Sequence, residues 1–278
     1  MNQTEIQYCR SIMLGIDAPV KRSFPEAREN GDMLKSAMKI SLVVPAFNEE
    51  RLLPGSLGSI RAAMAGLERL GWTSELIVCD NNSTDRTAEI AKAAGARVVF
   101  EPVNQISRAR NTGAACAGGD WIFFVDADST PTVELFLEAA DSIRAGRCLA
   151  GGSAIAYEDP HPGVALAIGI WNAVGRLNKW AAGSFIFCEA AAFRETGGFS
   201  EELYASEEID LFRRLKRLAR RERRTIVILH RHPLRTSDRK LQLYGWREFF
   251  RFMVKTVVSR GRTLRSREEC FAWYDGRR

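Results

Sequence analysis

The chain has few histidines, no closely spaced cysteine pair and no hydrophobic run of membrane-spanning length. Its 278 residues include 3 histidines and 6 cysteines, and no two cysteines form a C-x-x-C pair. Several cysteines lie in apolar stretches, which is typical of small reduced core residues. No apolar run reaches the roughly 18 residues of a spanning helix, and the first residues show no charged segment followed by a long apolar one. We therefore expect a cytoplasmic protein that is neither secreted nor transmembrane.

Charge is divided unevenly along the chain. The net charge is +6, but residues 213–278 hold 21 basic and 6 acidic residues, and residues 1–212 carry a net charge of −9. Such asymmetry predicts an anionic partner for the C-terminal part. We expect no nucleic acid, because the sequence contains no motif that recognises a duplex.

The length and the hydrophobic content of 46% predict one main domain with tails. Residues 1–38 mix polar, charged and turn residues without periodicity, so we expect a poorly ordered arm there. Residues 39–235 form the expected domain. Residues 236–278 form a basic segment in which apolar residues recur at helical spacing from 246 to 258. This amphipathic helix either docks on the protein body or lies on an anionic membrane surface.

Strands and helices alternate through the first part of the expected domain. Apolar stretches at 40–45, 75–79, 98–100 and 121–125 read as strands, and the segments between them show helical spacing or capping residues. This alternation predicts an α/β fold with a doubly wound, mainly parallel central sheet and flanking helices.

Two aspartates follow the most apolar of these strands. The run at 121–125 is apolar throughout, as in a strand buried on both faces, and Asp126 and Asp128 emerge at its carboxyl end. Open α/β sheets bind ligands at this edge. Strand alternation puts both carboxylates on one side, where they can converge on a divalent cation that carries a phosphate. Taken alone, an Asp-x-Asp sequence is also compatible with a solvated surface loop.

Four segments, taken together, resemble the family 2 glycosyltransferases of the GT-A fold. They are Val43-Val44-Pro45-Ala46-Phe47-Asn48-Glu49, Ile77-Val78-Cys79-Asp80-Asn81-Asn82-Ser83-Thr84-Asp85, Arg110-Asn111-x-Gly113, and the stretch from Gly119 to Asp128. The resemblance covers roughly residues 39–235. Each segment alone is a weak signal, whereas four in this order at these separations are a strong one. The resemblance implies transfer of a sugar from a nucleotide diphosphate sugar to an acceptor.

The resemblance also implies a metal site. Asp128 would bind the cation directly, and Asp126 would contact the ribose or reach the cation through water. Magnesium or manganese suits such oxygen ligands and stabilises the charge of a departing nucleoside diphosphate. Several GT-A enzymes place a further histidine ligand after the strand that corresponds to 225–229, where His230 and His232 stand before a proline expected to end the strand. A hydrogen-bonded structural role is the alternative for both histidines.

Donor binding is implied for residues that follow the first strands. They are Pro45, Ala46, Phe47, Glu49, Asp80, Asn81 and Arg110, together with Asp126. Asn81 departs from the commoner pattern, which has an acidic residue there. Because an amide donates as well as accepts hydrogen bonds, this departure leaves the base preference open, with uridine favoured. Helix capping is the alternative role of the segment 81–83.

The resemblance assigns catalysis to the head of a helix that begins near residue 207. Family members carry a Glu-Asp pair there, and the second carboxylate deprotonates the acceptor hydroxyl. Alignment on Asp210 and Leu211 gives Glu208 this role and leaves Glu207 as the neighbouring candidate. Stabilisation of the helix N-terminus is the alternative for both glutamates. A single displacement of this kind inverts the anomeric carbon.

These observations predict a metal-dependent glycosyltransferase, cytoplasmic or peripheral on the inner face of the membrane. The donor is a nucleotide sugar, with a UDP-sugar favoured, and the hydroxyl acceptor is unidentified, with a lipid-linked or polysaccharide precursor as one candidate. A sugar-phosphate nucleotidyltransferase is an alternative, but its Gly-rich basic loop is absent from residues 45–50. A non-catalytic nucleotide-sugar binding module is the other alternative, and the carboxylates of Asp126, Asp128 and Glu208 count against it.

Overall fold

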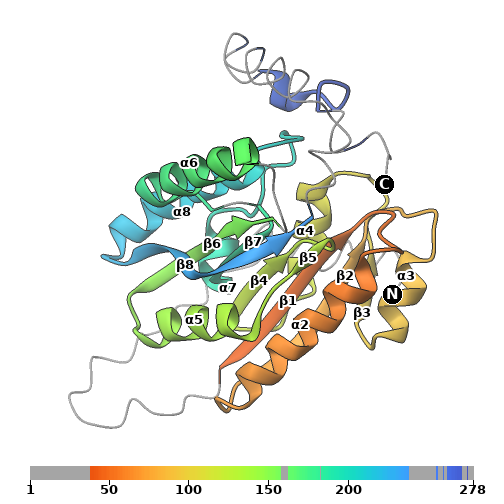
Figure 1. Ribbon diagram of the computed structural model, residues 1–278, viewed down its shortest axis with the longest axis horizontal. Coiled ribbons are helices and arrows are strands. Elements are labelled where there is room, and N and C mark those ends of the chain that lie inside the picture. The colour runs from red at the N-terminus through yellow and green to blue at the C-terminus, as the bar shows by residue number, and fades with distance from the viewer. Residues whose placement is uncertain are drawn as a thin grey trace, which may run out of the picture.

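The computed structural model describes residues 38–157, 162–181, 183–237, 255, 259, 262–270 and 274 (Figure 1). The predicted N-terminal arm, up to residue 37, lies outside the described residues. The predicted amphipathic helix at 246–258 also lies outside them, except for Lys255. In the described part, no helix combines the length and the hydrophobicity needed to cross a membrane.

The first half of the domain alternates strands and helices as predicted. The elements are β1 Lys39–Ala46, α2 Leu53–Glu68, β2 Thr73–Asp80, α3 Thr87–Ala93, β3 Arg97–Phe100, α4 Ile106–Ala115 and β4 Trp121–Val125. Strand β1 pairs in parallel with β2 and β4, and β2 pairs in parallel with β3. The predicted doubly wound parallel sheet is confirmed for this half.

The second half adds antiparallel pairs to the same sheet. Its elements are β5 Ser129–Thr130, α5 Val133–Arg144, β6 Cys148–Ala156, α6 Pro162–Asn178, β7 Phe185–Glu189, α7 Ala190–Glu195, α8 Glu207–Arg221, β8 Thr225–Thr236 and a 3-10 turn Arg262–Arg265. The strand order is β3-β2-β1-β4-β7-β6-β8-β5, with β7 antiparallel to β4 and β6. The sequence pattern did not predict β7 or α7.

Strand β8 differs from the expectation that Pro233 ends it. It continues to Thr236, but its pairing with β6 jumps from Ser153–Leu229 to Ile155–Leu234. The residues of β8 between these two pairs therefore bulge out of the ladder. Proline is tolerated here because a bulged position does not need to donate a backbone hydrogen bond.

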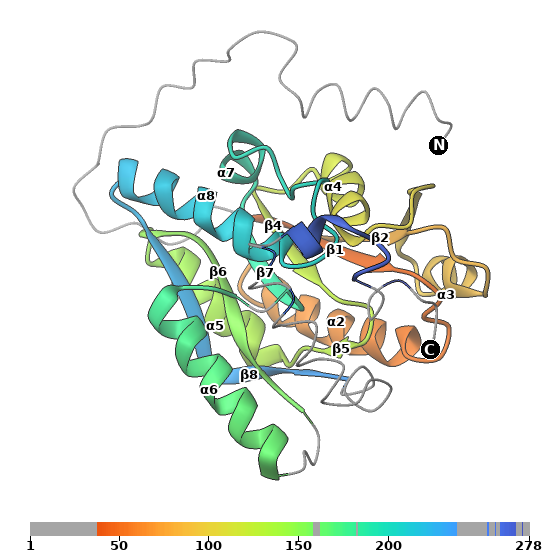
Figure 2. The same ribbon diagram turned by 90° about the horizontal axis from the view of Figure 1, so that it is seen from above.

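Strand β4 lies at the centre of the core, as its apolar sequence predicts. Helices α2 and α5 cover one face of the sheet, and α4, α7 and α8 cover the other (Figure 2). Phe123 points to the first face and packs on rings from α5 and β7 at centroid distances of 5.4–5.8 Å. Phe124 points to the second face and packs on Phe193 and Phe199 at 5.2 and 5.1 Å. This packing gives the carboxylates that follow β4 a rigid base.

Helix α4 lies unusually close to the sheet. A Cβ atom added at Gly113 would lie only 2.4 Å from Cγ1 of Val43, so only glycine permits this approach. The close contact places Arg110, one turn earlier in α4, beside the end of β4.

Candidate active site

A pocket lies at the carboxyl ends of β1, β2 and β4. These strands are parallel, so their carboxyl ends lie at the same edge of the sheet. The lining of the pocket is Pro45, Ala46, Phe47, Glu49, Asn81, Asn104, Ile106, Asp126, Ala127, Asp128 and Tyr274. Most of the residues expected to bind donor and metal therefore converge on this pocket.

The loops after β1 and β2 support each other through hydrogen bonds. The backbone N–H groups of Asn48 and Glu49 donate to the hydroxyls of Ser83 and Thr87 at 3.0 and 2.8 Å. The Asn48 amide oxygen in turn accepts from the Thr84 N–H at 2.8 Å. Helix α3 begins only at Thr87, so the expectation that Asn82 or Ser83 caps it is wrong. The two motif segments instead form one hydrogen-bonded wall of the pocket.

Asp80 and Asn81 have different surroundings. Asp80 is buried and does not line the pocket, and its carboxylate accepts the Ser83 N–H at 3.1 Å. The Asn81 amide nitrogen donates to the carbonyl oxygens of Glu101 and Val103 at 3.3 and 2.7 Å. These two bonds use the amide nitrogen of Asn81 as a donor within the protein. The amide oxygen is then the group that Asn81 can offer to a ligand.

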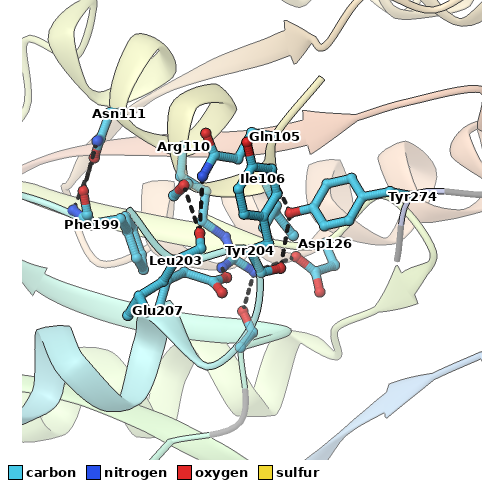
Figure 3. A network of polar contacts seen from close by, with 12 residues as sticks. Gln105, Ile106, Arg110, Asn111, Asp126, Phe199, Leu203, Tyr204, Glu207 and Tyr274 are labelled. Atoms are coloured by element: carbon cyan, nitrogen blue, oxygen red, sulfur yellow. Dashed lines mark hydrogen bonds and ion pairs between the residues drawn. The ribbon is translucent and has the colours of Figure 1, made fainter. Parts of the chain in front are cut away.

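Arg110 joins the end of β4 to the head of α8 (Figure 3). Its guanidinium lies 2.9 Å from Oδ1 of Asp126 and 2.6 Å from Oε1 of Glu207, and it donates to the Gly183 carbonyl at 2.9 Å. It also lies 5.1 Å from the centroid of the Phe199 ring. The Arg110 side chain is 1% exposed and does not line the pocket, so this geometry does not support the expected donor contact.

Glu207 and Glu208 begin α8, as predicted. The preceding Ser206 has a left-handed backbone with φ of 61°, which turns the chain into the helix. Glu207 is buried against Arg110, and the carboxyl carbon of Glu208 lies 3.6 Å from the place that a Cβ at Gly183 would occupy. Burial and then the charge of Glu207 raise the pKa of Glu208 to about 8, while Arg110 opposes the shift. A carboxyl with a pKa near working pH suits proton transfer.

The site carries more negative than positive charge. The pKa of Arg110 is raised by the charges of Asp126, Glu207 and Glu208, against the effect of its burial, so three carboxylates surround one guanidinium. In the part of the chain that the structure describes, no three His, Cys, Asp or Glu side chains form a metal cluster. Magnesium is commonly held by one or two carboxylates together with substrate phosphates. Asp126 and Asp128 suit a cation of this kind, bound with a diphosphate.

The histidines proposed as metal ligands lie elsewhere. His230 and His232 are exposed and do not line the pocket, and their backbone N–H groups donate to the Glu138 carboxylate of α5 at 3.4 and 3.2 Å. The bulge between Leu229 and Leu234 displaces them from the regular strand on which the expectation was based. This geometry gives no support to metal binding by either histidine.

Four lining residues were not among the predicted site residues, and one of them, Ala127, lies between Asp126 and Asp128. Asn104 and Ile106 lie between β3 and α4, and the Asn104 amide donates to the Asn81 carbonyl at 3.2 Å. Their position after a predicted strand of the same sheet was a usable signal. Tyr274 comes from near the end of the chain, and no spacing or motif marked it.

The chain belongs to glycosyl transferase family 2. The sequence model of that family, "Glycosyl transferase family 2", matches residues 41–195, which is more than half of the chain. This match confirms the family that the four sequence segments indicate. Both glutamates at the head of α8 and Tyr274 lie outside the matched residues.

Two relatives illustrate the sequence similarity. Probable glycosyltransferase YdaM of Bacillus subtilis (strain 168) is 34% identical over 120 residues, which are 40% of this chain and 27% of the relative. Glucosyl-3-phosphoglycerate synthase of Mycobacterium tuberculosis (strain CDC 1551 / Oshkosh) is 36% identical over 111 residues, which are 37% of this chain and 33% of the relative. The chain thus spans about a third or less of the length of these relatives.

Solved structures show the same fold. Glucosyl-3-phosphoglycerate synthase from Mycobacterium tuberculosis, in complex with Mn²⁺, UDP and phosphoglyceric acid, gives a TM-score of 0.56 at 22% identity over 85% of this chain and 84% of that chain. S. aureus TarS 1–349 in complex with UDP gives 0.55 at 20% identity over 84% of this chain and 68% of that chain. These likenesses confirm the predicted GT-A fold.

We predict that Arg110→Leu lowers the free energy of unfolding by about 3–5 kcal/mol, because Glu207 would keep a buried charge without its partner. The loss should shrink as the pH falls, since protonation neutralises the carboxylates left behind. Arg213→Leu is the control, because this exposed guanidinium pairs with Asp210 at 3.4 Å and should matter by only about 0.5 kcal/mol. Urea denaturation at several pH values measures both variants. Equal stability of Arg110→Leu and wild type would contradict the central role of Arg110.

Proposed function

We propose that the protein transfers a sugar from a UDP-sugar to a hydroxyl acceptor with a divalent cation. One observation carries this proposal: the pocket holds Asp126 and Asp128, and buried Arg110 ties Asp126 to Glu207, the neighbour of Glu208. Glu208 does not line the pocket, but its carboxyl interacts with the charges of Arg110 and Asp126, so the proposed base lies close to the proposed place for a metal-bound diphosphate. Family membership favours this reaction over a nucleotidyltransferase or a non-catalytic binding module.

The state of Asn81 supports uridine as the base. Uracil presents one N–H donor between two carbonyl acceptors, and the Asn81 amide oxygen can accept that hydrogen bond. Because its nitrogen already donates to Glu101 and Val103, Asn81 offers an acceptor here, as the commoner acidic residue would. Pro45, Phe47 and Glu49 complete the nucleoside wall of the pocket. The solved structures similar to this chain include complexes of glucosyl-3-phosphoglycerate synthase and of TarS with UDP.

Asp126 and Asp128 are the residues that would hold Mg²⁺ or Mn²⁺. Asp126 uses Oδ1 for Arg110, which leaves Oδ2 for the cation, a bridging water or the ribose. When bound, the cation stabilises the negative charge that develops on the departing diphosphate. The similar glucosyl-3-phosphoglycerate synthase has been solved with UDP and either Mn²⁺ or Mg²⁺. The hydrogen bond from Arg110 orients Asp126 at the pocket edge.

Glu208 is the proposed general base. Its carboxylate takes the proton of the acceptor hydroxyl while the acceptor oxygen forms a bond to the anomeric carbon and the bond to the diphosphate oxygen breaks. UDP leaves with the electron pair of that bond, and the single displacement inverts the carbon. Asp210 is engaged by Arg214 at 2.8 Å and Arg213 at 3.4 Å, so it is less suited to this role. Glu207 positions the helix head through its ion pair with Arg110.

The surface of α6 supports a membrane-bound acceptor. Leu166, Ile170 and Leu177 are 68%, 57% and 85% exposed, which is unusual for a helix so poor in charge. Lys179, Lys216 and Arg220 line a hollow beside Leu177. Burial and the positive charges of Arg220 and Lys179 lower the pKa of Lys216, so these cations are close together. The C-terminal end of α6 meets α8, where the Lys216 ammonium donates to the Asn178 carbonyl. This combination suits an anionic lipid surface, where a lipid-linked acceptor would be found.

We predict that Mn²⁺ and UDP bind cooperatively, because no three His, Cys, Asp or Glu side chains of the described residues form a metal cluster and the diphosphate must supply further ligands. Calorimetry should show weak binding of Mn²⁺ alone and much tighter binding of Mn²⁺ in the presence of UDP. Asp128→Ala should abolish metal-dependent UDP binding. Asp141→Ala, on the exposed side of α5, is the control and should bind as wild type does. Undiminished affinity in Asp128→Ala would remove the metal assignment.

We predict that Glu208→Gln leaves the Kd for UDP nearly unchanged but lowers kcat by about 10²–10⁴, since the amide cannot take the acceptor proton. The wild-type rate should rise with pH and level off above about pH 8, because only the ionised carboxyl acts as a base. UDP release with candidate acceptors is the measurement, and Asp210→Asn is the control. Wild-type rates in Glu208→Gln together with loss of activity in Glu207→Gln would show that Glu207 is the base.

We predict that the protein floats with vesicles that contain phosphatidylglycerol and not with neutral vesicles. Each basic residue near such a surface contributes about 1 kcal/mol, and added salt should weaken the binding. Replacing Leu166 and Leu177 together by serine should reduce flotation. Phe100→Ser is the control, because Phe100 is 45% exposed on β3, at the other edge of the sheet from β8. Absence of flotation at low salt would exclude α6 as a lipid-binding face.

A further inference from the structure

Tyr274 is a pocket residue that the family match does not contain. Among the described residues that line the pocket, it alone lies outside residues 41–195. It belongs to the basic C-terminal segment. The described residues 262–270 and 274 of that segment are called here the C-terminal clasp. The clasp therefore contributes one wall of the proposed nucleotide site.

The hydroxyl of Tyr274 connects two chain segments (Figure 3). It donates to the Tyr204 carbonyl at 3.0 Å and accepts from the Ile106 N–H at 3.4 Å. Ile106 begins α4 and itself lines the pocket. Burial and the charge of Glu207 raise the pKa of Tyr274, so its hydroxyl keeps the proton that it donates. The two rings of Tyr274 and Tyr204 also pack edge to face at 5.5 Å.

The segment at 201–206 leads directly into Glu207 and Glu208, and the clasp holds it. Both backbone polar groups of Tyr204 bond to the clasp, because its N–H donates to the Leu264 carbonyl at 2.7 Å and its carbonyl accepts from Tyr274. On the other side, the Gln105 amide donates to the carbonyls of Glu201 and Leu203 at 2.8 and 2.9 Å. The segment is thus held between the head of α4 and the clasp.

A second contact ties the clasp to the pocket. The Arg267 guanidinium donates to the amide oxygen of Asn104 at 3.2 Å and lies 5.8 Å from the centroid of the Tyr274 ring. Cys270 is fully buried, which anchors the clasp on the domain. The clasp therefore contacts the proposed nucleotide pocket through Asn104 and Ile106. It contacts the segment that leads to the proposed general base, Glu208, through Tyr204.

We propose that Tyr274 is a positioning residue for the transfer reaction: its ring forms a wall for the nucleotide, and its hydroxyl fixes the segment that carries Glu208. This assignment rests on the proposed function. A displacement of about 1 Å of a catalytic group costs about 10²-fold in rate, so loss of two hydrogen bonds at this position should be measurable. The ring and the hydroxyl have separable effects, which two variants can distinguish.

The experiment compares Tyr274→Phe and Tyr274→Ala with wild type in the full chain. Tyr274→Phe keeps the ring, so its Kd for UDP with Mn²⁺ should stay within about threefold, while kcat falls about tenfold or more, because both hydrogen bonds of the hydroxyl are lost. Tyr274→Ala should in addition weaken UDP binding about tenfold. Arg265→Ala is the matched control, because Arg265 belongs to the clasp but forms an exposed ion pair with Glu202 at 3.3 Å. It should match wild type in both quantities.

Hydrogen exchange of residues 201–208 without nucleotide gives a second, independent readout. Exchange should be faster in Tyr274→Phe than in wild type and unchanged in Arg265→Ala. Unchanged exchange in Tyr274→Phe overturns the inference, as does a lower melting temperature with unchanged Kd and kcat, which marks a merely structural anchor. Failure of wild type to bind UDP would instead refute the proposed donor, and the exchange data would still decide the role of Tyr274.

Discussion

The site depends on one buried cation, the guanidinium of Arg110. It lies where the end of β4, the helix α4 and the head of α8 meet, and it bonds to Asp126, Glu207 and the Gly183 carbonyl. Burying a guanidinium costs folding free energy unless partners accept its hydrogen bonds. The positions of these partners are therefore constrained together with that of Arg110. Gly113 allows α4 to lie close to the sheet, and this close packing lets Arg110 reach the end of β4. Arg110 thereby brings the end of β4 and the head of α8, which no single sequence motif contains, into one site.

The charge left over around Arg110 matches the chemistry proposed for the pocket. One guanidinium faces the three carboxylates of Asp126, Glu207 and Glu208, and burial and then the charge of Glu207 raise the pKa of Glu208. A divalent cation at Asp126 and Asp128 would reduce this negative charge, and a proton taken by Glu208 would do so as well. Binding of a metal with a diphosphate and acceptance of a proton are therefore favoured by one electrostatic arrangement. The family match ends at residue 195 and does not include α8. The ion pair between Arg110 and Glu207 is the contact that connects α8 to the site.

Periodicity and strand-end chemistry predicted much of the fold and the place of Asp126 and Asp128, and the family resemblance added the residues that follow β1 and β2. The apolar run before Asp126 is a strand buried on both faces, and Pro45, Phe47 and Asn81 do meet at the edge of the sheet. His230 and His232 do not line the pocket, because the expectation for them assumed a regular strand where the pairing of β8 with β6 skips residues. Periodicity also gave no sign of β7, whose antiparallel pairing with β4 depends on partners distant in sequence.

The sequence by itself determined the alternation of strands and helices and the position of Asp126 and Asp128, because periodic burial and backbone hydrogen bonding act over a few residues. Only the tertiary structure decided that Arg110 is a buried link and that Tyr274 reaches the pocket. Such contacts depend on how closely a helix approaches the sheet and on where a distant segment folds back. Local patterns do not encode these distances, since the contacts arise from the packing of the whole domain.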